Sequence, residues 1–270
     1  MRRLAAAVLL AAAGWQAAPQ SASVQAPPAP SPAPSPRPHA PAPGPWAKRT
    51  LAKMTLAEKA AQMIGVRAFG LYRHKRASER RTLLDQVRRL RVGCVVVFES
   101  EVESLPTLLN ELQDAAPVPL LIAADMERGI SFRIRRGVVP LPYAMAVGAT
   151  GSEDAARFTG TIAAREGRAL GIHWAFAPVV DVNNNPGNPV INIRSYGEDP
   201  EMVSRLTAAF VRGAREGGLM TTAKHFPGHG DTALDSHMQL VTVNADRPRL
   251  DAVELRPFRR VVDAGGPHSR

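Results

Sequence analysis

Short apolar runs alternate with longer amphipathic segments along residues 55–264. Apolar runs bounded by Gly, Pro or Asp are typical of buried strands, and apolar residues spaced three or four positions apart are typical of helices. We expect strands at 93–98, 119–124, 173–177 and 219–223. We expect helices at 55–64, 76–91, 103–115, 152–170, 200–216 and 246–264.

Capping residues mark several of these boundaries. Thr55 and Glu58 have the spacing of a capping box, in which each side chain satisfies a backbone N–H of the other. Ser152 can cap the helix that follows it. Pro200 suits a first helical position, and Gly217 suits the end of the same helix.

The alternation of strands and helices predicts an α/β fold with a parallel sheet. Short strands rich in branched residues favour a TIM-type (β/α) barrel, with an open doubly wound sheet as the alternative. No glycine-rich phosphate loop follows the first strands. Polar residues follow three strands, at Asp125, Asp181 and Lys224. In a barrel these positions meet on one face.

The first 46 residues have a different composition from the rest. The chain begins like a signal peptide, with two arginines, an apolar stretch too short to span a membrane and small residues through Ser23. The alternative is an uncleaved anchor. Residues 24–46 are a Pro/Ala-rich linker, either a tether or a passive disordered leader. We therefore expect a signal peptide at 1–23, a linker at 24–46 and a barrel domain at 47–270, in a secreted or periplasmic protein that the linker could tether to the cell envelope.

The net charge of +10 comes from scattered basic residues. Aromatic residues are not interleaved with them, so a solvated basic surface is favoured over a nucleic-acid site. The single cysteine, Cys94, lies within a predicted strand, which indicates a buried thiol and no disulfide framework.

Ionisable residues are concentrated at 223–237, directly after a predicted strand. The segment contains Lys224, His225, His229, Asp231, Asp235 and His237. So many titratable groups with so little apolar surface are unsuited to a core. A polar loop after a strand is where an α/β enzyme carries its chemistry.

Asp235 and His237 form a candidate proton-transfer dyad, because a neighbouring carboxylate orients an imidazole and raises its basicity. Ser236 between them could instead be a nucleophile, although no Gly-x-Ser-x-Gly elbow is present. A metal could bind to the same segment, but no second ligand set with metal spacing appears, and we expect neither metal nor cofactor. The candidate metal ligands are His225, His229, Asp231 and His237.

Three further residues are suited to binding an oxygen-rich ligand. Asp125 can accept hydrogen bonds from the hydroxyls of a polyol, and Arg133 can donate over the same opening; the alternative is an ion pair of Asp125 with Arg133 or Arg128. Arg194 is suited to bidentate recognition. Its alternative is a pairing with Glu198 or Asp199.

These motifs together resemble glycoside hydrolase family 3, and most closely its bacterial β-N-acetylhexosaminidase branch. The resemblance rests on Lys-His-Phe-Pro-Gly-His-Gly-Asp-Thr at 224–232, Asp-Ser-His at 235–237, Asp-Met-Glu-Arg-Gly at 125–129 and Asn-Ile-Arg-Ser-Tyr-Gly-Glu-Asp-Pro at 192–200. It implies a TIM-type barrel and a retaining reaction through a covalent glycosyl-enzyme. The implied substrate is a glycan with a terminal β-linked N-acetylglucosamine, and we expect a monomer.

The resemblance also implies residue roles. His237 would be the acid/base and Asp235 its support, on a loop hinged at Gly228 and Gly230. The implied sugar contacts are Lys224, His225, Asp125, Arg133 and Arg194.

Two positions depart from the family pattern. Arg128 stands where the family usually has Gly. The family nucleophile is an Asp after a later strand, and none of the acids in this sequence occupies its place. We therefore expect a truncated member, an incomplete barrel of about five or six strand–helix units, with weak or no hydrolysis. The alternatives are an inactive sugar-binding remnant and a metal-dependent hydrolase.

Overall fold

The computed structural model describes residues 44–71 and 78–265. The predicted signal peptide, nearly all of the linker and the start of the predicted helix at 76–91 lie outside the described residues. The described residues from Ala47 onward form one compact unit. Within the described ranges, no helix is both long and apolar enough to cross a membrane.

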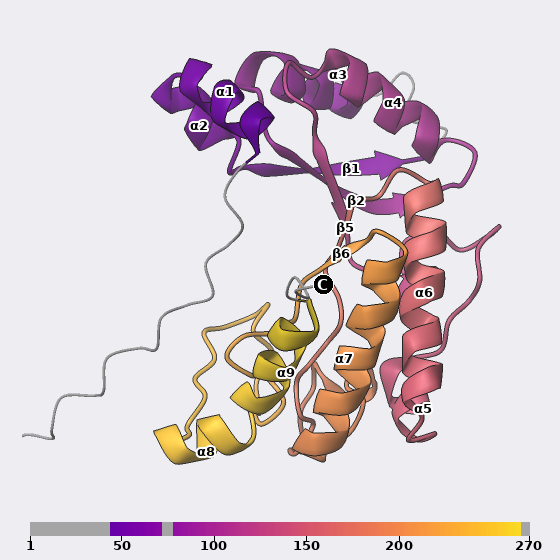
Figure 1. The fold of residues 1–270 in the computed structure, drawn as a ribbon, viewed down its shortest axis with the longest axis vertical. Coiled ribbons are helices and arrows are strands. Elements are labelled where there is room, and N and C mark those ends of the chain that lie inside the picture. The colour runs from indigo at the N-terminus through magenta and orange to yellow at the C-terminus, as the bar shows by residue number, and fades with distance from the viewer. Residues whose placement is uncertain (1–43, 72–77, 266–270) are drawn as a thin grey trace, which may run out of the picture. The chain divides into compact units, whose positions relative to one another are not determined.

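A five-stranded sheet forms the centre of this unit (Figure 1). Its strands are β1 (Gly65–Gly70), β2 (Cys94–Ser100), β3 (Leu121–Ala124), β5 (Trp174–Ala175) and β6 (Met220–Thr221). All neighbouring pairs are parallel, and the strands follow one another in chain order. A parallel sheet wound in chain order is the arrangement of a (β/α) barrel, so the predicted fold class is confirmed.

Helices precede, connect and follow the strands. They are α1 (Pro45–Lys53), α2 (Leu56–Ala61), α3 (Ser78–Asp85), α4 (Leu105–Ala115), α5 (Ala144–Gly148), α6 (Glu153–Ala169), α7 (Pro200–Glu216), α8 (Arg247–Ala252) and α9 (Leu255–Gly265). Two short turns of other helix types occur at η2 (Gln86–Leu90) and η3 (Asn192–Arg194). A further short strand, β4 (Glu127–Ile130), lies against α6.

Helix boundaries follow the capping signals. The capping box of Thr55 and Glu58 is present, Ser152 accepts a hydrogen bond from the N–H of Ala155 at 3.2 Å, and α7 has its predicted bounds. The strand β1 was not predicted, because its sequence Gly-Val-Arg-Ala-Phe-Gly has few apolar residues and a charge in the middle. The strands β5 and β6 are shorter than predicted.

The single helix predicted at 246–264 is wrong, since the structure has two helices there. The first of them, α8, ends at Ala252 with Val253 as its C-cap. Pro257 lies in the first turn of α9 and has no N–H to donate to the carbonyl of Val253, so a continuous helix would lose that hydrogen bond.

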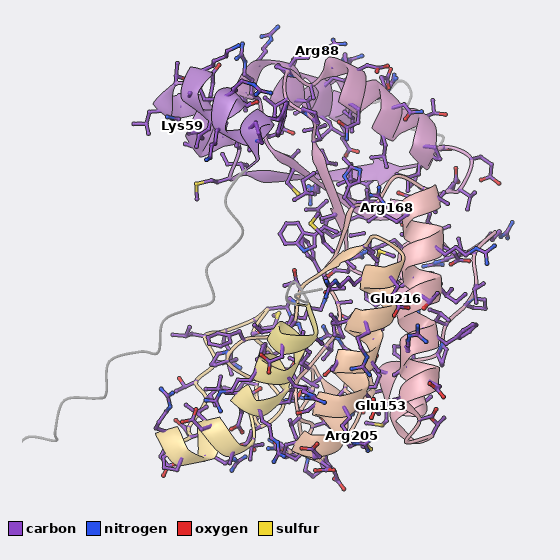
Figure 2. The ribbon with its side chains drawn as sticks, in the orientation of Figure 1. Lys59, Arg88, Glu153, Arg168, Arg205 and Glu216 are labelled. Carbon is purple, nitrogen blue, oxygen red and sulfur yellow. The ribbon has the colours of Figure 1, made fainter. Side chains whose placement is uncertain are left out.

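The long helices α6 and α7 lie side by side because glycines face the contact (Figure 1). A Cβ on Gly160 would lie 2.1 Å from the carbonyl oxygen of Phe210, so only Gly permits this approach. At one end Glu153 binds Arg205 at 3.3 Å (Figure 2). Glu153 also binds Arg212 at 2.9 Å.

Candidate functional site

Polar residues converge at the carboxyl end of the sheet, as the barrel prediction requires. Lys224 follows β6 and forms an isolated parallel bridge with Val179, which follows β5. The Nζ of Lys224 lies 2.9 Å from Oδ1 of Asp125 and 2.7 Å from Oε1 of Glu127. Residues 99 positions apart in the sequence therefore share one ionic cluster.

Two arginines complete this cluster. Arg133 donates to Asp125, which is the ion pair that the sequence left as an alternative. Arg194 binds Glu127 in a bidentate manner, with Nε at 2.9 Å from Oε2 and Nη2 at 2.8 Å from Oε1. The pairing of Arg194 with Glu198 or Asp199 is wrong, because Asp199 instead caps α7.

Glu127 is a member of the cluster that sequence reasoning missed. Burial alone would raise the pKa of this carboxyl, but the hydrogen bonds and positive charges of Arg194 and Lys224 outweigh burial and lower its pKa to about 2. The available signal was its spacing, because residues two apart on an extended segment share a face, and Glu127 is two positions after Asp125.

Asp181 is the second residue whose role the sequence did not reveal. Its carboxylate is fully buried and accepts Nδ1 of His225 at 2.6 Å. It also accepts the backbone N–H of His225 at 3.1 Å and that of His229 at 2.7 Å. Since Nδ1 of His225 donates to Asp181, its Nε2 is an acceptor, and Arg194 Nη2 lies 3.2 Å from it.

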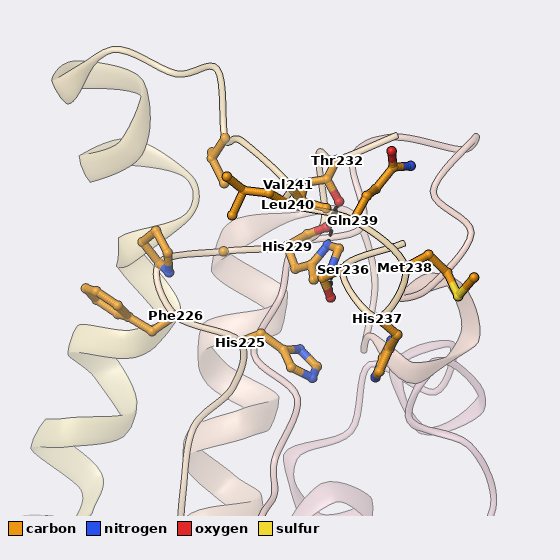
Figure 3. Close-up of a pocket in the computed structure, with 13 residues that line it drawn as sticks. His225, Phe226, His229, Thr232, Ser236, His237, Met238, Gln239, Leu240 and Val241 are labelled. Atoms are coloured by element: carbon orange, nitrogen blue, oxygen red, sulfur yellow. Dashed lines mark hydrogen bonds between the residues drawn. The ribbon is translucent and has the colours of Figure 1, made fainter. Parts of the chain in front are cut away.

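The predicted dyad is formed and lies at a pocket. Nδ1 of His237 is 2.7 Å from Oδ1 of Asp235, and the His237 side chain is 76% exposed. A cavity of about 600 Å³ is lined by residues that include His225, His229, Ser236 and His237 (Figure 3). The structure thus places the ring of His237 at the same cavity as the ring of His225.

Ser236 has a different partner from the one that a serine triad with Asp235 and His237 would need. Its Oγ lies 2.9 Å from Nε2 of His229, while the Nδ1 of His229 faces the hydroxyl of Thr232 (Figure 3). Among the residues that the structure describes, no carboxylate bonds to the His229 ring, so this arrangement lacks the group that stabilises an imidazolium in such triads. Among the described residues, no group of three or more His, Cys, Asp or Glu side chains could hold a metal ion.

The two glycines predicted as hinges are held tightly by packing. A Cβ on Gly230 would lie 1.7 Å from the carbonyl oxygen of Val182. Gly228 has φ of +139°, and a Cβ there would lie 2.8 Å from the side chain of Glu254. Both positions require Gly in this conformation, and the hinge motion stays a prediction.

Asparagines hold the loop after β5 in place. The Oδ1 of Asn188 accepts the N–H groups of Val190 and Ile191 at 2.8 and 2.7 Å. Its Nδ2 donates to the carbonyl of His229 at 2.7 Å. The same amide therefore stabilises its own loop and fixes the neighbouring one.

Arg128, at the position where the sequence departs from the family pattern, fits without disturbing the loop. Its guanidinium lies over the ring of Tyr143, 4.4 Å from the centroid. The next residue, Gly129, has φ of +61°, and a Cβ there would meet Leu141 at 2.9 Å. In this turn it is therefore position 129, and not position 128, that needs Gly.

Comparison with known proteins identifies relatives. The profile described as "Glycosyl hydrolase family 3 N terminal domain" matches residues 55–267. Beta-hexosaminidase A of Pseudoalteromonas piscicida is 38% identical over 197 residues, which are 68% of this chain and 33% of that protein. A glycoside hydrolase family 3 beta-N-acetylglucosaminidase from Paenibacillus sp. is 42% identical with a TM-score of 0.73, covering 78% of this chain and 40% of that one.

A solved structure titled as the beta-glucoside phosphorylase BglX bound to 2FGlc is also similar. It is 30% identical with a TM-score of 0.75, covering 82% of this chain and 38% of that one. The chain thus spans about a third of the length of the Pseudoalteromonas relative and well under half of both structures.

Proposed function

The chain belongs to glycoside hydrolase family 3, and from this premise we propose that its cavity binds a terminal β-linked N-acetylglucosamine of a glycan and transfers a proton to the departing oxygen. The observation that carries the proposal is the position of His237. Its ring is bonded to Asp235 and lines the same cavity as His225. A general acid must lie within reach of the atom that it protonates. A sugar bound in the shared cavity would lie beside His237.

His237 is the acid/base in this proposal. Its Nδ1 is occupied by Asp235, which leaves Nε2 to carry the proton that is exchanged with the substrate. The pKa of Asp235 is lowered, first by the backbone N–H of His237 and then by its ring, so the carboxylate stays ionised beside the imidazole. An ionised partner stabilises the imidazolium that forms during proton transfer.

The ionic cluster binds the sugar in this proposal. At the carboxyl end of the sheet, donors come from Lys224, Arg133 and Arg194, and acceptors come from Asp125. Because their charges are already paired, they are held in fixed positions before the sugar arrives, and sugar hydroxyls can complete their remaining hydrogen bonds.

A retaining reaction also needs a nucleophilic carboxylate. Three carboxylates of the described site are already engaged: Asp125 and Glu127 by cations, and Asp181 by three N–H groups of the loop. We therefore assign none of them as the nucleophile. This same observation favours a second candidate function, in which the chain binds the sugar without hydrolysing it.

Calorimetry with N-acetylglucosamine tests the binding proposal. We expect the full chain to bind the sugar, Lys224→Ala to lose at least tenfold in affinity, and His237→Ala to keep the wild-type affinity within about threefold. An absence of binding heat from the folded wild-type chain would contradict the proposal.

An aryl β-N-acetylglucosaminide separates the two candidate functions. Any hydrolysis by the chain is expected to fall by about 10²- to 10⁴-fold in His237→Ala, which is the typical contribution of a general acid. Binding with no turnover in the wild type supports the sugar-binding function. Turnover that His237→Ala leaves unchanged would exclude the acid/base role.

A further inference from the structure

Residues 233–245 carry the acid/base dyad but have few attachments to the fold. They contain no helix or strand, and Met238 and Leu240 are 81% and 94% exposed. Their backbone bonds, Met238 and Gln239 to Asp235, lie within the segment. Within the part of the chain that the structure describes, the bond of Ser236 to His229 is the one hydrogen bond that joins this segment to residues outside it.

The partner of Ser236 is fixed firmly. His229 is 8% exposed, its N–H donates to the buried carboxylate of Asp181 at 2.7 Å, and its carbonyl accepts Nδ2 of Asn188 at 2.7 Å. Since both ends of its peptide unit are bonded to the loop after β5, the imidazole is a rigid support under a loosely held segment.

The hydrogen-bond network defines the direction of the Ser236 bond. The hydroxyl of Thr232 donates to the carbonyl of His229 at 2.9 Å, so its oxygen is left to accept from Nδ1–H of His229. With the proton on Nδ1, the Nε2 atom is assigned as the acceptor, and Ser236 donates its hydroxyl proton to it.

We propose that Ser236 is a positioning residue: its hydroxyl, held by the buried ring of His229, fixes the adjoining Asp235 and His237 at the mouth of the cavity. This inference rests on the proposed function for its significance, because it concerns the proposed acid/base. Asp181 bonds directly to His225 and to the backbone of His229, and the ring of His229 bonds to Ser236. The same carboxylate therefore orients His225 and, through His229 and Ser236, holds the dyad. One buried group thereby sets the position of the sugar-binding ring relative to the acid.

The ring signals of the histidines report on this bond directly. In the full chain with ¹⁵N-labelled histidine, we expect Ser236→Ala to shift the Nε2 resonance of His229 and to narrow the ring signals of His237 toward those of an unrestrained imidazole. Ser236→Thr keeps a hydroxyl and should return both sets of signals toward wild type. Ser104→Ala is the matched control: it removes a hydroxyl that donates to Glu101, far in sequence from the dyad. It should change neither set of signals.

The outcome can be separated from that of the proposed function. In Ser236→Ala, the affinity for N-acetylglucosamine should change less than threefold. The rate of any hydrolysis should fall at least tenfold, and the fall should be in kcat rather than in KM. His237 signals that are the same in Ser236→Ala and wild type would overturn the positioning role, even if the chain binds the sugar. Altered His237 signals in a chain that binds no sugar would support the positioning role and count against the proposed function.

Discussion

Asp181 and His225 are joined by a 2.6 Å contact between a carboxylate oxygen and Nδ1 of the ring, although 44 positions separate them. The carboxylate has no exposed surface, and it also receives the N–H groups of His225 and His229. A charged acceptor surrounded by N–H donors holds the loop after β6 against the loop after β5. The ring of His225 therefore has one tautomer and one direction.

Replacing Asp181 by Asn tests this relationship. The new amide keeps the shape of the side chain but directs an NH₂ group at positions now occupied by donors. We expect a loss of about 3 kcal/mol of unfolding free energy and at least a tenfold weaker binding of N-acetylglucosamine. Urea unfolding and calorimetry measure the two effects.

Asp231→Asn is the control for that variant, because Asp231 is partly exposed and forms a 3.3 Å surface pair with Arg249. It should lose less than about 1 kcal/mol. Equal losses in the two variants would contradict the role given to Asp181.

The Glu127 carboxylate should be a major source of stability. Its side chain is 6% exposed and binds both Arg194 and Lys224, so Glu127→Gln leaves Arg194 without its counter-charge and Lys224 with Asp125 alone. We expect a loss of about 3 kcal/mol in urea unfolding at pH 7. Glu216→Gln breaks the exposed pair with Arg157 and should cost below about 1 kcal/mol. If the two variants unfold alike, the cluster is not stabilising.

The contribution of Glu127 should depend on pH in a defined window. Its pKa falls from 4.5 to about 2 on folding, so the folded state binds the proton less readily than the unfolded state. The stabilisation is therefore complete above pH 4.5 and is lost as the pH falls through about 2. Across this window the difference in unfolding free energy between wild type and Glu127→Gln should shrink by about 3 kcal/mol. Urea unfolding of both proteins at pH 6, 4 and 2 measures it, and a difference that does not vary with pH would refute it.

Gly230 should not tolerate a side chain. A Cβ there would lie 1.7 Å from the backbone oxygen of Val182, so Gly230→Ala must displace the loop that carries the dyad. We expect a loss of more than about 2 kcal/mol and altered His237 ring signals. Gly265→Ala is the matched control, because the nearest atom to its Cβ is at an ordinary 3.8 Å and the residue ends α9. Its unfolding free energy should be unchanged or higher; similar losses in both would show that packing at Val182 is not the cause.

The bounds of α7 and the convergence of polar residues could be predicted because their causes are local. Pro200 and Gly217 mark the ends of α7 in the sequence itself, and an acid or lysine directly after a parallel strand must lie at the same end of the sheet. The strand β1 could not be predicted in the same way, because Gly65 and Arg67 give it little apolar character and its pairing with β2 supplies the hydrogen bonds.

The sequence by itself determined the alternation of strands and helices from β2 to β6, the family motifs and the adjacency of Asp235 with His237, since each depends on neighbours within a few positions. The tertiary structure alone decided which polar and charged groups meet. Arg194 binds Glu127 rather than Glu198 or Asp199, and Ser236 binds His229 rather than His237. The reason is physical. Ion pairs and hydrogen bonds form between whichever groups the packed sheet and loops bring within about 3 Å, and separation along the chain does not determine that distance.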